Sequence, residues 1–212
     1  MRRYGWLVVC LFLLLMQIDS NAQTINTICG TGTGGYAGDG GPAVSAQING
    51  GSGICRDAIG NIYIADMFNN RIRKIDLYGN ISTVAGNGTA GYSGDGGLAT
   101  SASIMTPRGV AVDATGNLFI SDGTYRIRKV NIAGIITTIC GNGISAHSGD
   151  GGPALSASIM SVGHITFDQF TGDLYFCDFQ AYRVRKITPA GIISTIAGNG
   201  TAGSSGDGGF AV

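Results

Sequence analysis

The chain has 212 residues, of which 37 are glycine, and its 13 Lys and Arg side chains are balanced by 13 acidic ones, all of them Asp. A net charge near zero gives no global field that would favour nucleic acid or an anionic membrane as a partner. The lack of Glu, together with the abundance of Asp and Gly, favours short strands joined by tight turns over helices.

Residues 1–22 have the features of a secretion signal. Arg2 and Arg3 provide the charged start, and an apolar run follows over 7–16. This run is shorter than the roughly 20 apolar residues that a transmembrane helix needs. We therefore expect cleavage near Ala22 and a secreted or periplasmic mature chain without a membrane anchor.

The tetrapeptide Gly-Asp-Gly-Gly organises the rest of the chain. It occurs four times, its Asp residues are spaced by 56, 55 and 57 positions, and the flanking sequence recurs with it. Such a period indicates a repeat architecture. We expect one repeat domain over residues 23–212, with repeats at approximately 30–85, 86–140 and 141–197 and a partial repeat at 198–212.

Each repeat has the same internal order. A glycine-rich loop comes first, and a stretch of small residues such as 99–105 follows, whose composition allows a short helical turn. Four β-prone runs come next, separated by turn residues such as Gly116-Asn117. In the second repeat these runs are 109–113, 118–122, 125–130 and 135–140. Four strands joined in sequence predict one antiparallel sheet per repeat.

The strands are apolar on both faces, so each sheet has to stack against others. This is the environment of a blade in a β-propeller, whereas the coils of a parallel β-helix, at roughly 20 residues, fit the period poorly. Propellers close with about 4 to 8 blades, and the sequence supplies three. We therefore expect an all-β fold, an incomplete or open propeller. Residues 24–30, which match the end of a repeat, support the interpretation that the sequence is a fragment of a longer protein.

The strand sequences resemble NHL repeats. In the second repeat the resemblance rests on 109–113, 116–122 and 126–130, and the same pattern stands at 57–75 and 168–187. It covers nearly all of the mature chain. The resemblance implies a propeller with one four-stranded blade per repeat, here with a glycine-rich insert between blades.

The repeated Asp of each glycine-rich loop is a candidate ligand for Ca²⁺, which prefers several oxygen ligands. One carboxylate per loop is few for such a site, and Asp in these loops also accepts backbone hydrogen bonds. We expect a structural role and no cofactor, and keep Ca²⁺ as the alternative. The residues concerned are Asp39, Asp95, Asp150 and Asp207.

Most basic residues lie in Arg-x-Arg-Lys tracts, one per repeat, each preceded by an Asp four or five positions earlier. A basic ridge would suit RNA phosphates, but a secreted protein rarely meets RNA, and guanidinium groups pair well with carboxylates between packed sheets. We therefore predict structural pairs between blades and no nucleic-acid partner. The predicted pairs are Asp66 with Arg71, Asp122 with Arg126, and Asp178 with Arg183.

Four cysteines remain after cleavage, namely Cys29, Cys55, Cys140 and Cys177. Each replaces a small residue of another repeat, and equivalent positions in different repeats lie far apart. We expect free, buried thiols that act as small apolar side chains, with disulfides as the alternative. The two histidines, His147 and His164, have no repeat equivalent and offer too few ligands for zinc.

Two functional hypotheses follow. The first is a non-catalytic binding or scaffolding module that contacts a protein or carbohydrate through its inter-blade loops and either joins further blades or self-associates. The alternative is a metal-dependent hydrolase or lyase of the gluconolactonase type, with catalytic residues in blades missing from the sequence. Because catalytic groups usually occur once and these polar groups recur in every repeat, we predict no catalytic residue.

Overall fold

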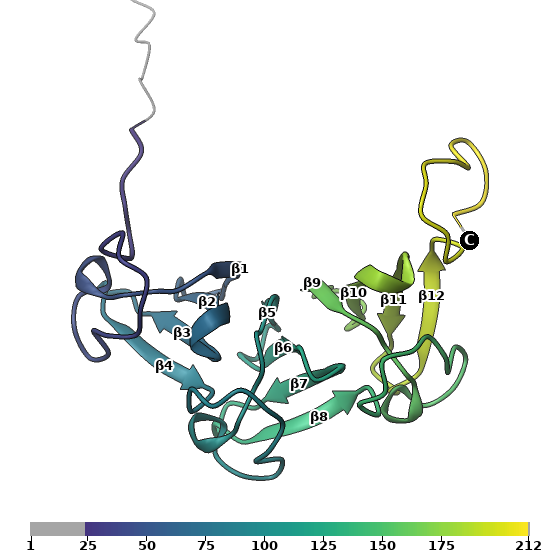
Figure 1. The fold of residues 1–212 in the computed structure, drawn as a ribbon. Coiled ribbons are helices and arrows are strands. Elements are labelled where there is room, and N and C mark those ends of the chain that lie inside the picture. The colour runs from purple at the N-terminus through teal and green to yellow at the C-terminus, as the bar shows by residue number, and fades with distance from the viewer. Residues whose placement is uncertain (1–23, 212) are drawn as a thin grey trace, which may run out of the picture.

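The computed structural model describes residues 24–211, so the predicted leader at 1–22 lies outside the described residues. Three antiparallel four-stranded sheets stack side by side into an open arc (Figure 1). The expected all-β propeller architecture, with one blade per repeat and three blades present, is confirmed. None of the helices formed by residues 24–211 is long and apolar enough to cross a membrane.

The strands of each sheet are neighbours in sequence order, so every sheet is a meander. The first sheet holds β1 (Gly51–Arg56), β2 (Ile62–Asp66), β3 (Arg71–Ile75) and β4 (Ile81–Ala85). The second holds β5 (Val110–Val112), β6 (Leu118–Asp122), β7 (Arg126–Val130) and β8 (Ile136–Cys140). The third holds β9 (Val162–Phe167), β10 (Leu174–Asp178), β11 (Arg183–Ile187) and β12 (Ile193–Ala197).

Short 3₁₀ turns complete the blades. The small-residue stretches form η1 (Ala43–Ser45), η3 (Ala99–Ser101) and η4 (Ala154–Ser156), as their composition allows. In the first and third sheets, η2 (Met67–Asn69) and η5 (Phe179–Ala181) connect the second strand to the third. The second sheet has one residue fewer at this turn and no such helix.

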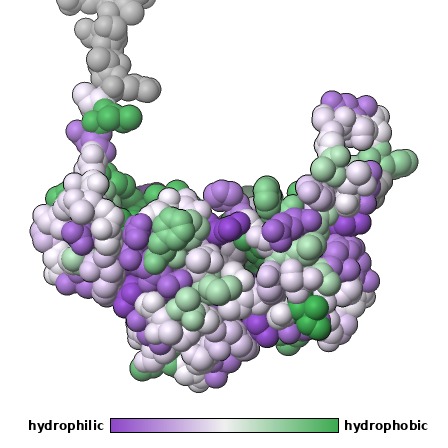
Figure 2. All heavy atoms as spheres, in the orientation of Figure 1, coloured by the Kyte–Doolittle hydropathy of each residue, from purple (hydrophilic) through white to green (hydrophobic). Residues whose placement is uncertain are grey.

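The core lies in the two junctions between sheets. At the first junction, Tyr63 and Ile72 of the first sheet pack with Val112 and Leu118 of the second. At the second junction, Phe119 packs in the same way with residues of the third sheet. The innermost strands β1, β5 and β9 lie on the concave side of the arc (Figure 1). Its outside is mostly neutral or polar, with scattered apolar side chains (Figure 2).

Each of the first three glycine-rich loops covers the outer edge of the sheet that follows it in sequence. The Gly96 N–H donates to the Ile136 carbonyl (2.8 Å), and the Ile136 N–H donates to the Gly97 carbonyl (3.0 Å). Gly94 has φ 85°, and a Cβ there would lie 2.8 Å from the Ala102 Cα, so only glycine fits. The loop thereby protects the edge strand β8 from pairing with another chain.

Residues 24–30 carry the sequence of a fourth strand but form no strand, since no sheet of the described residues offers them a partner. Ile25 is accordingly 99% exposed. The four cysteines within residues 24–211 are free, as expected, but only Cys140 is buried, while Cys29 and Cys55 are half-buried. Burial raises the pKa of the Cys140 thiol to about 12. Cys177, in contrast, is exposed, because it lies on the face of the third sheet that no described residue covers.

Candidate functional site

The Asp of each of the first three glycine-rich loops is tied into a hydrogen-bond network with the sheet that follows it. Asp39 Oδ1 accepts from Arg73 Nε (3.0 Å) and Nη2 (2.6 Å). Its Oδ2 accepts from the Tyr36 hydroxyl (2.9 Å) and from the N–H (3.1 Å) and hydroxyl (2.6 Å) of Thr83. Burial alone would raise the pKa of Asp39, but the bonds from Thr83 and Tyr36 and the charge of Arg73 hold it below its usual range. Both oxygens therefore already have partners within the fold.

The same Arg side chain forms a second, fully buried ion pair. Arg73 Nη1 lies 3.2 Å from Asp66 Oδ2, and neither side chain is exposed. The equivalent distances are 3.3 Å for Arg128 with Asp122 and 3.6 Å for Arg185 with Asp178. Each buried guanidinium thus bridges one carboxylate on the second strand and one on the glycine-rich loop.

This geometry corrects the ion pairs expected from the sequence. Asp66 stands opposite Arg71 in the strand register, yet its carboxylate pairs with Arg73. Arg71 lies at the strand end, where its guanidinium stacks on the Tyr36 ring (3.7 Å) and donates to the Asn87 carbonyl (2.8 Å) of the next loop. The ion pairs therefore stay within one repeat, whereas Arg71 joins successive repeats through a carbonyl.

The other two repeats show the same division of roles. Arg126 stacks on the Tyr92 ring at 3.8 Å and donates to the Asn142 carbonyl at 3.3 Å. Arg183 donates to the Asn199 carbonyl at 3.0 Å. The predicted pairs Asp122 with Arg126 and Asp178 with Arg183 are thus replaced by pairs with Arg128 and Arg185.

The third repeat departs from this pattern because His147 stands where the others have Tyr. Its Nε2 lies 3.4 Å from the Thr195 hydroxyl and 3.9 Å from Asp150 Oδ2. Burial, followed by the charges of Arg185 and Arg183, lowers the pKa of His147. The environment of the imidazole therefore favours its neutral form. His164, the other histidine, is exposed on β9.

Asp150 binds Arg185 Nη2 at 2.6 Å, and Asp95 binds Arg128 and the Tyr92 hydroxyl in the manner of Asp39. Asp207 is exposed, and its carboxylate makes no hydrogen bond within residues 24–211. Over the same range, no three His, Cys or Asp side chains gather closely enough to hold a metal ion. A Ca²⁺ role for the four loop residues stays a prediction.

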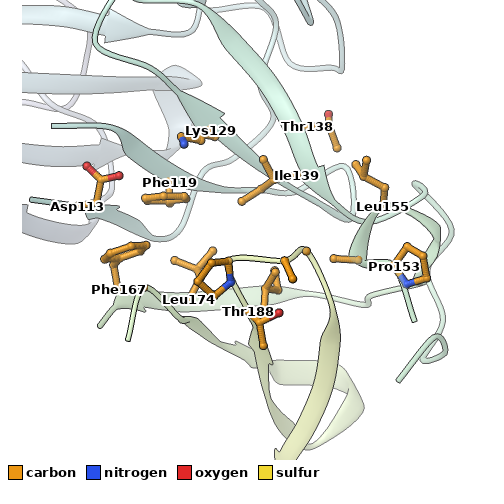
Figure 3. Close-up of a pocket in the computed structure, with 16 residues that line it drawn as sticks. Asp113, Phe119, Lys129, Thr138, Ile139, Pro153, Leu155, Phe167, Leu174 and Thr188 are labelled. Carbon is orange, nitrogen blue, oxygen red and sulfur yellow. The ribbon is translucent and has the colours of Figure 1, made fainter. Parts of the chain in front are cut away.

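A cavity of about 580 Å³ opens between the second and third sheets, and we call it the junction cavity (Figure 3). Its lining is mainly apolar. The rings of Phe119 and Phe167 stack at one end, with centroids 5.0 Å apart and planes at 15°. The whole lining comprises Asp113, Phe119, Lys129, Thr138, Ile139, Pro153, Ala154, Leu155, Phe167, Gly172, Leu174, Ile187, Thr188, Pro189, Ala190 and Gly191.

Two charged side chains line the junction cavity, and they differ in whether their charge has a partner within the fold. Asp113 accepts four hydrogen bonds from the amides, hydroxyl and side-chain amide of Thr115 and Asn117. Lys129 Nζ lies 5.6 Å from the centroid of the Phe119 ring and has no ion pair within 4.0 Å among residues 24–211. Lys129 is thus the uncommitted charge of the cavity.

Sequence reasoning missed the junction cavity, although the repeat register contains its signal. Phe119 stands where the other repeats have Tyr63 and Tyr175, and Phe167 stands where the second repeat has Val112. The Tyr63 hydroxyl donates to Asp57 (3.1 Å), a bond that Phe119 has no atom to make with Asp113. Departures from the repeat, rather than its repeated polar residues, mark this place.

The fold agrees with what comparison of the chain with known proteins shows. Residues 88–145, which contain the whole second sheet, match a family model described as Teneurin NHL domain. The match supports the resemblance of the repeats to NHL repeats, and the three stacked four-stranded sheets make the chain a β-propeller segment.

Two relatives illustrate the similarity. The chain is 37% identical to Teneurin-1 of Gallus gallus over 100 residues, and 38% identical to Teneurin-3 of Mus musculus over 96 residues. These matches cover 41% and 39% of this chain and only 4% of either relative. The chain thus corresponds to a small part of the teneurins that it resembles.

Among solved structures, a putative phosphatase from Bacteroides thetaiotaomicron superposes with a TM-score of 0.52 at 20% identity. The match covers 67% of this chain and 34% of that one. At this identity the likeness concerns the fold alone.

Proposed function

We propose that the chain is a non-catalytic binding module and that the junction cavity is its ligand site. The observation that carries this proposal is a mainly apolar cavity of about 580 Å³ between two packed sheets. Its volume falls within the roughly 300–1,000 Å³ of sites for small ligands. Pro153 and Leu155 bring the inter-blade loop into the lining, in keeping with ligand contacts on these loops.

The polar residues that recur in every repeat have a structural role, because they pair with one another inside the fold. We therefore assign ligand binding to the junction cavity and not to these residues. Arg73 pairs with both Asp39 and Asp66, and the same arrangement recurs in each repeat. A group that serves as general acid, base or nucleophile needs free access to substrate. The buried Asp66 and Arg73 have no such access.

We further propose that the module acts outside the cytoplasm, since residues 1–22 have the composition of an export signal. In this proposal its ligand is a protein or carbohydrate group presented to one face of the arc. The open faces of the first and third sheets would meet further blades of a longer chain or another copy.

The proposal is tested with hydrocinnamyl alcohol, a neutral aromatic probe, and isothermal titration calorimetry. Leu155 is 56% exposed on the cavity lining, so Leu155→Trp should fill the opening and abolish binding. Thr100 occupies the same place in η3, and Thr100→Trp at the first junction should leave binding intact. Equal binding by wild type and Leu155→Trp, or no binding by wild type, would overturn the proposal.

A further inference from the structure

We infer that the junction cavity takes an aromatic group that carries a carboxylate, with Lys129 as the cation that binds the carboxylate. The inference rests on the proposed function and names the chemical class of its ligand. It depends on three observations: the charge state of the cavity, the aromatic surface beside the charge, and a contrast with the third sheet.

The first observation concerns charge. Two charged side chains line the cavity. The carboxylate of Asp113 accepts hydrogen bonds from Thr115 and Asn117, with donor–acceptor distances of 2.7 to 3.0 Å. Burial alone would raise the pKa of Asp113, but these hydrogen bonds hold it below its usual range, so it stays an engaged anion. Lys129 alone is free to bind an anion.

The second observation is the surface beside that charge. Lys129 stands directly opposite Phe119 in the pairing of β6 with β7, and its ammonium lies over the ring. Phe119 stacks on Phe167, and Leu174 extends the apolar wall (Figure 3). A ligand that enters therefore meets an apolar wall and, at its edge, one cation. An aromatic body with a carboxylate a few bonds away matches both.

The third observation is a contrast with the third sheet, where the equivalent lysine is neutralised. There Lys186 pairs with Asp173 at 3.1 Å. The position of Asp173 is held in the second sheet by Asn117, which cannot neutralise Lys129. The charge of Lys129 is therefore available to a ligand.

The chemistry of an aromatic carboxylate occurs both in free acids and in a peptide that ends in Phe. Hydrocinnamate and acetyl-Gly-Phe with a free carboxyl terminus separate these sources when both are titrated by calorimetry. Tighter binding of the peptide assigns the site to a chain terminus, and tighter binding of hydrocinnamate assigns it to a free acid. The carboxylate itself is tested by acetyl-Gly-Phe against its amide: weaker binding of the amide supports it, and equal binding contradicts it.

The decisive comparison is hydrocinnamate against hydrocinnamyl alcohol, which share the phenyl ring and the three-carbon chain but end in a carboxylate and a neutral hydroxyl group. We expect wild type to bind the acid about fivefold to tenfold more tightly than the alcohol. Lys129→Met keeps the apolar stem and should remove this preference without weakening the alcohol. Lys74→Met, at the equivalent position of the first sheet, should keep it. Asn117→Asp recreates the pair seen in the third sheet and should reduce the preference.

The outcomes separate the two proposals. If acid and alcohol bind wild type equally, or if Lys129→Met keeps the preference, the inference fails while the binding module stands. If neither compound binds wild type, both fail. Because a partly exposed ion pair is screened by salt, the preference should also shrink as ionic strength rises.

Discussion

The two junctions between sheets are built from equivalent positions, yet they differ where a ligand would meet them. At the first junction the Tyr63 hydroxyl donates a hydrogen bond to Asp57, and Val112 of the second sheet packs in the same apolar cluster as Tyr63. At the second, Phe119 and Phe167 stack, and the junction cavity opens beside them. The comparison teaches that repeated residues build the arc, whereas a binding site arises where one repeat departs from the others.

The largest effect should come from breaking the buried ion-pair network that recurs in every repeat. Arg128→Met leaves the buried carboxylate of Asp122 without its cation and should cost about 3–5 kcal/mol of unfolding free energy, measured by urea denaturation. Arg126→Met removes a stacked, half-buried side chain with its hydrogen bonds to the Thr124 and Asn142 carbonyls, and should cost about 1–2 kcal/mol. Equal costs for the two variants would contradict the assignment of Arg128 as the central residue of the network.

A smaller effect should follow from exchanging the aromatic residues that distinguish the junctions. Tyr63→Phe loses the 3.1 Å hydrogen bond to Asp57 and should cost about 0.5–1.5 kcal/mol in the same urea experiment. Phe119→Tyr should change stability less, because Asp113 already has its hydrogen bonds from Thr115 and Asn117. If Phe119→Tyr proves as costly as Tyr63→Phe, the two junctions do not differ in the way described.

The smallest effect concerns pH and the third repeat. The folded chain disfavours protonation of His147, so the unfolded chain binds the proton more readily below the ordinary His pKa of about 6.5. Stability from this source is fully present above that pH and is lost as pH falls from about 6.5 toward the lowered pKa of the folded state.

His147→Tyr installs the residue of the first two repeats and should remove this acid loss. It should also allow Arg183 to stack as Arg71 does on Tyr36. The melting temperatures of variant and wild type, compared between pH 7.5 and 5, measure the difference. A wild-type stability that rises on acidification relative to the variant would contradict the sign.

Much of the fold follows from the repeat pattern. The expected strand at 118–122 matches β6, and the expected run at 125–130 is one residue longer than β7. Hydrophobic runs and turn residues are local signals, so a single sequence reveals them. The period then identifies the blade, because equivalent positions in three repeats have to occupy equivalent environments.

The predictions that were wrong concern the direction in which side chains point from the sheets. Spacing alone could not show that Asp66 binds Arg73 while Arg71 reaches the next loop. The burial of Cys177 was wrong because it was inferred from Ala65 and Ser121, whose sheets are covered by a following sheet. The junction cavity was missed because it consists of a volume between sheets, to which Phe119 and Leu155 contribute from separate repeats.

The most direct test of a ligand site at the second junction is a map of amide NMR shifts during titration with hydrocinnamyl alcohol. The chain contains its own control, since every residue of the second junction has an equivalent at the first. We predict shifts confined to Asp113, Phe119, Leu155 and Leu174 and their neighbours, with the equivalent amides near Asp57 and Tyr63 unchanged. Equal shifts at both junctions, or none at the second, would contradict the account.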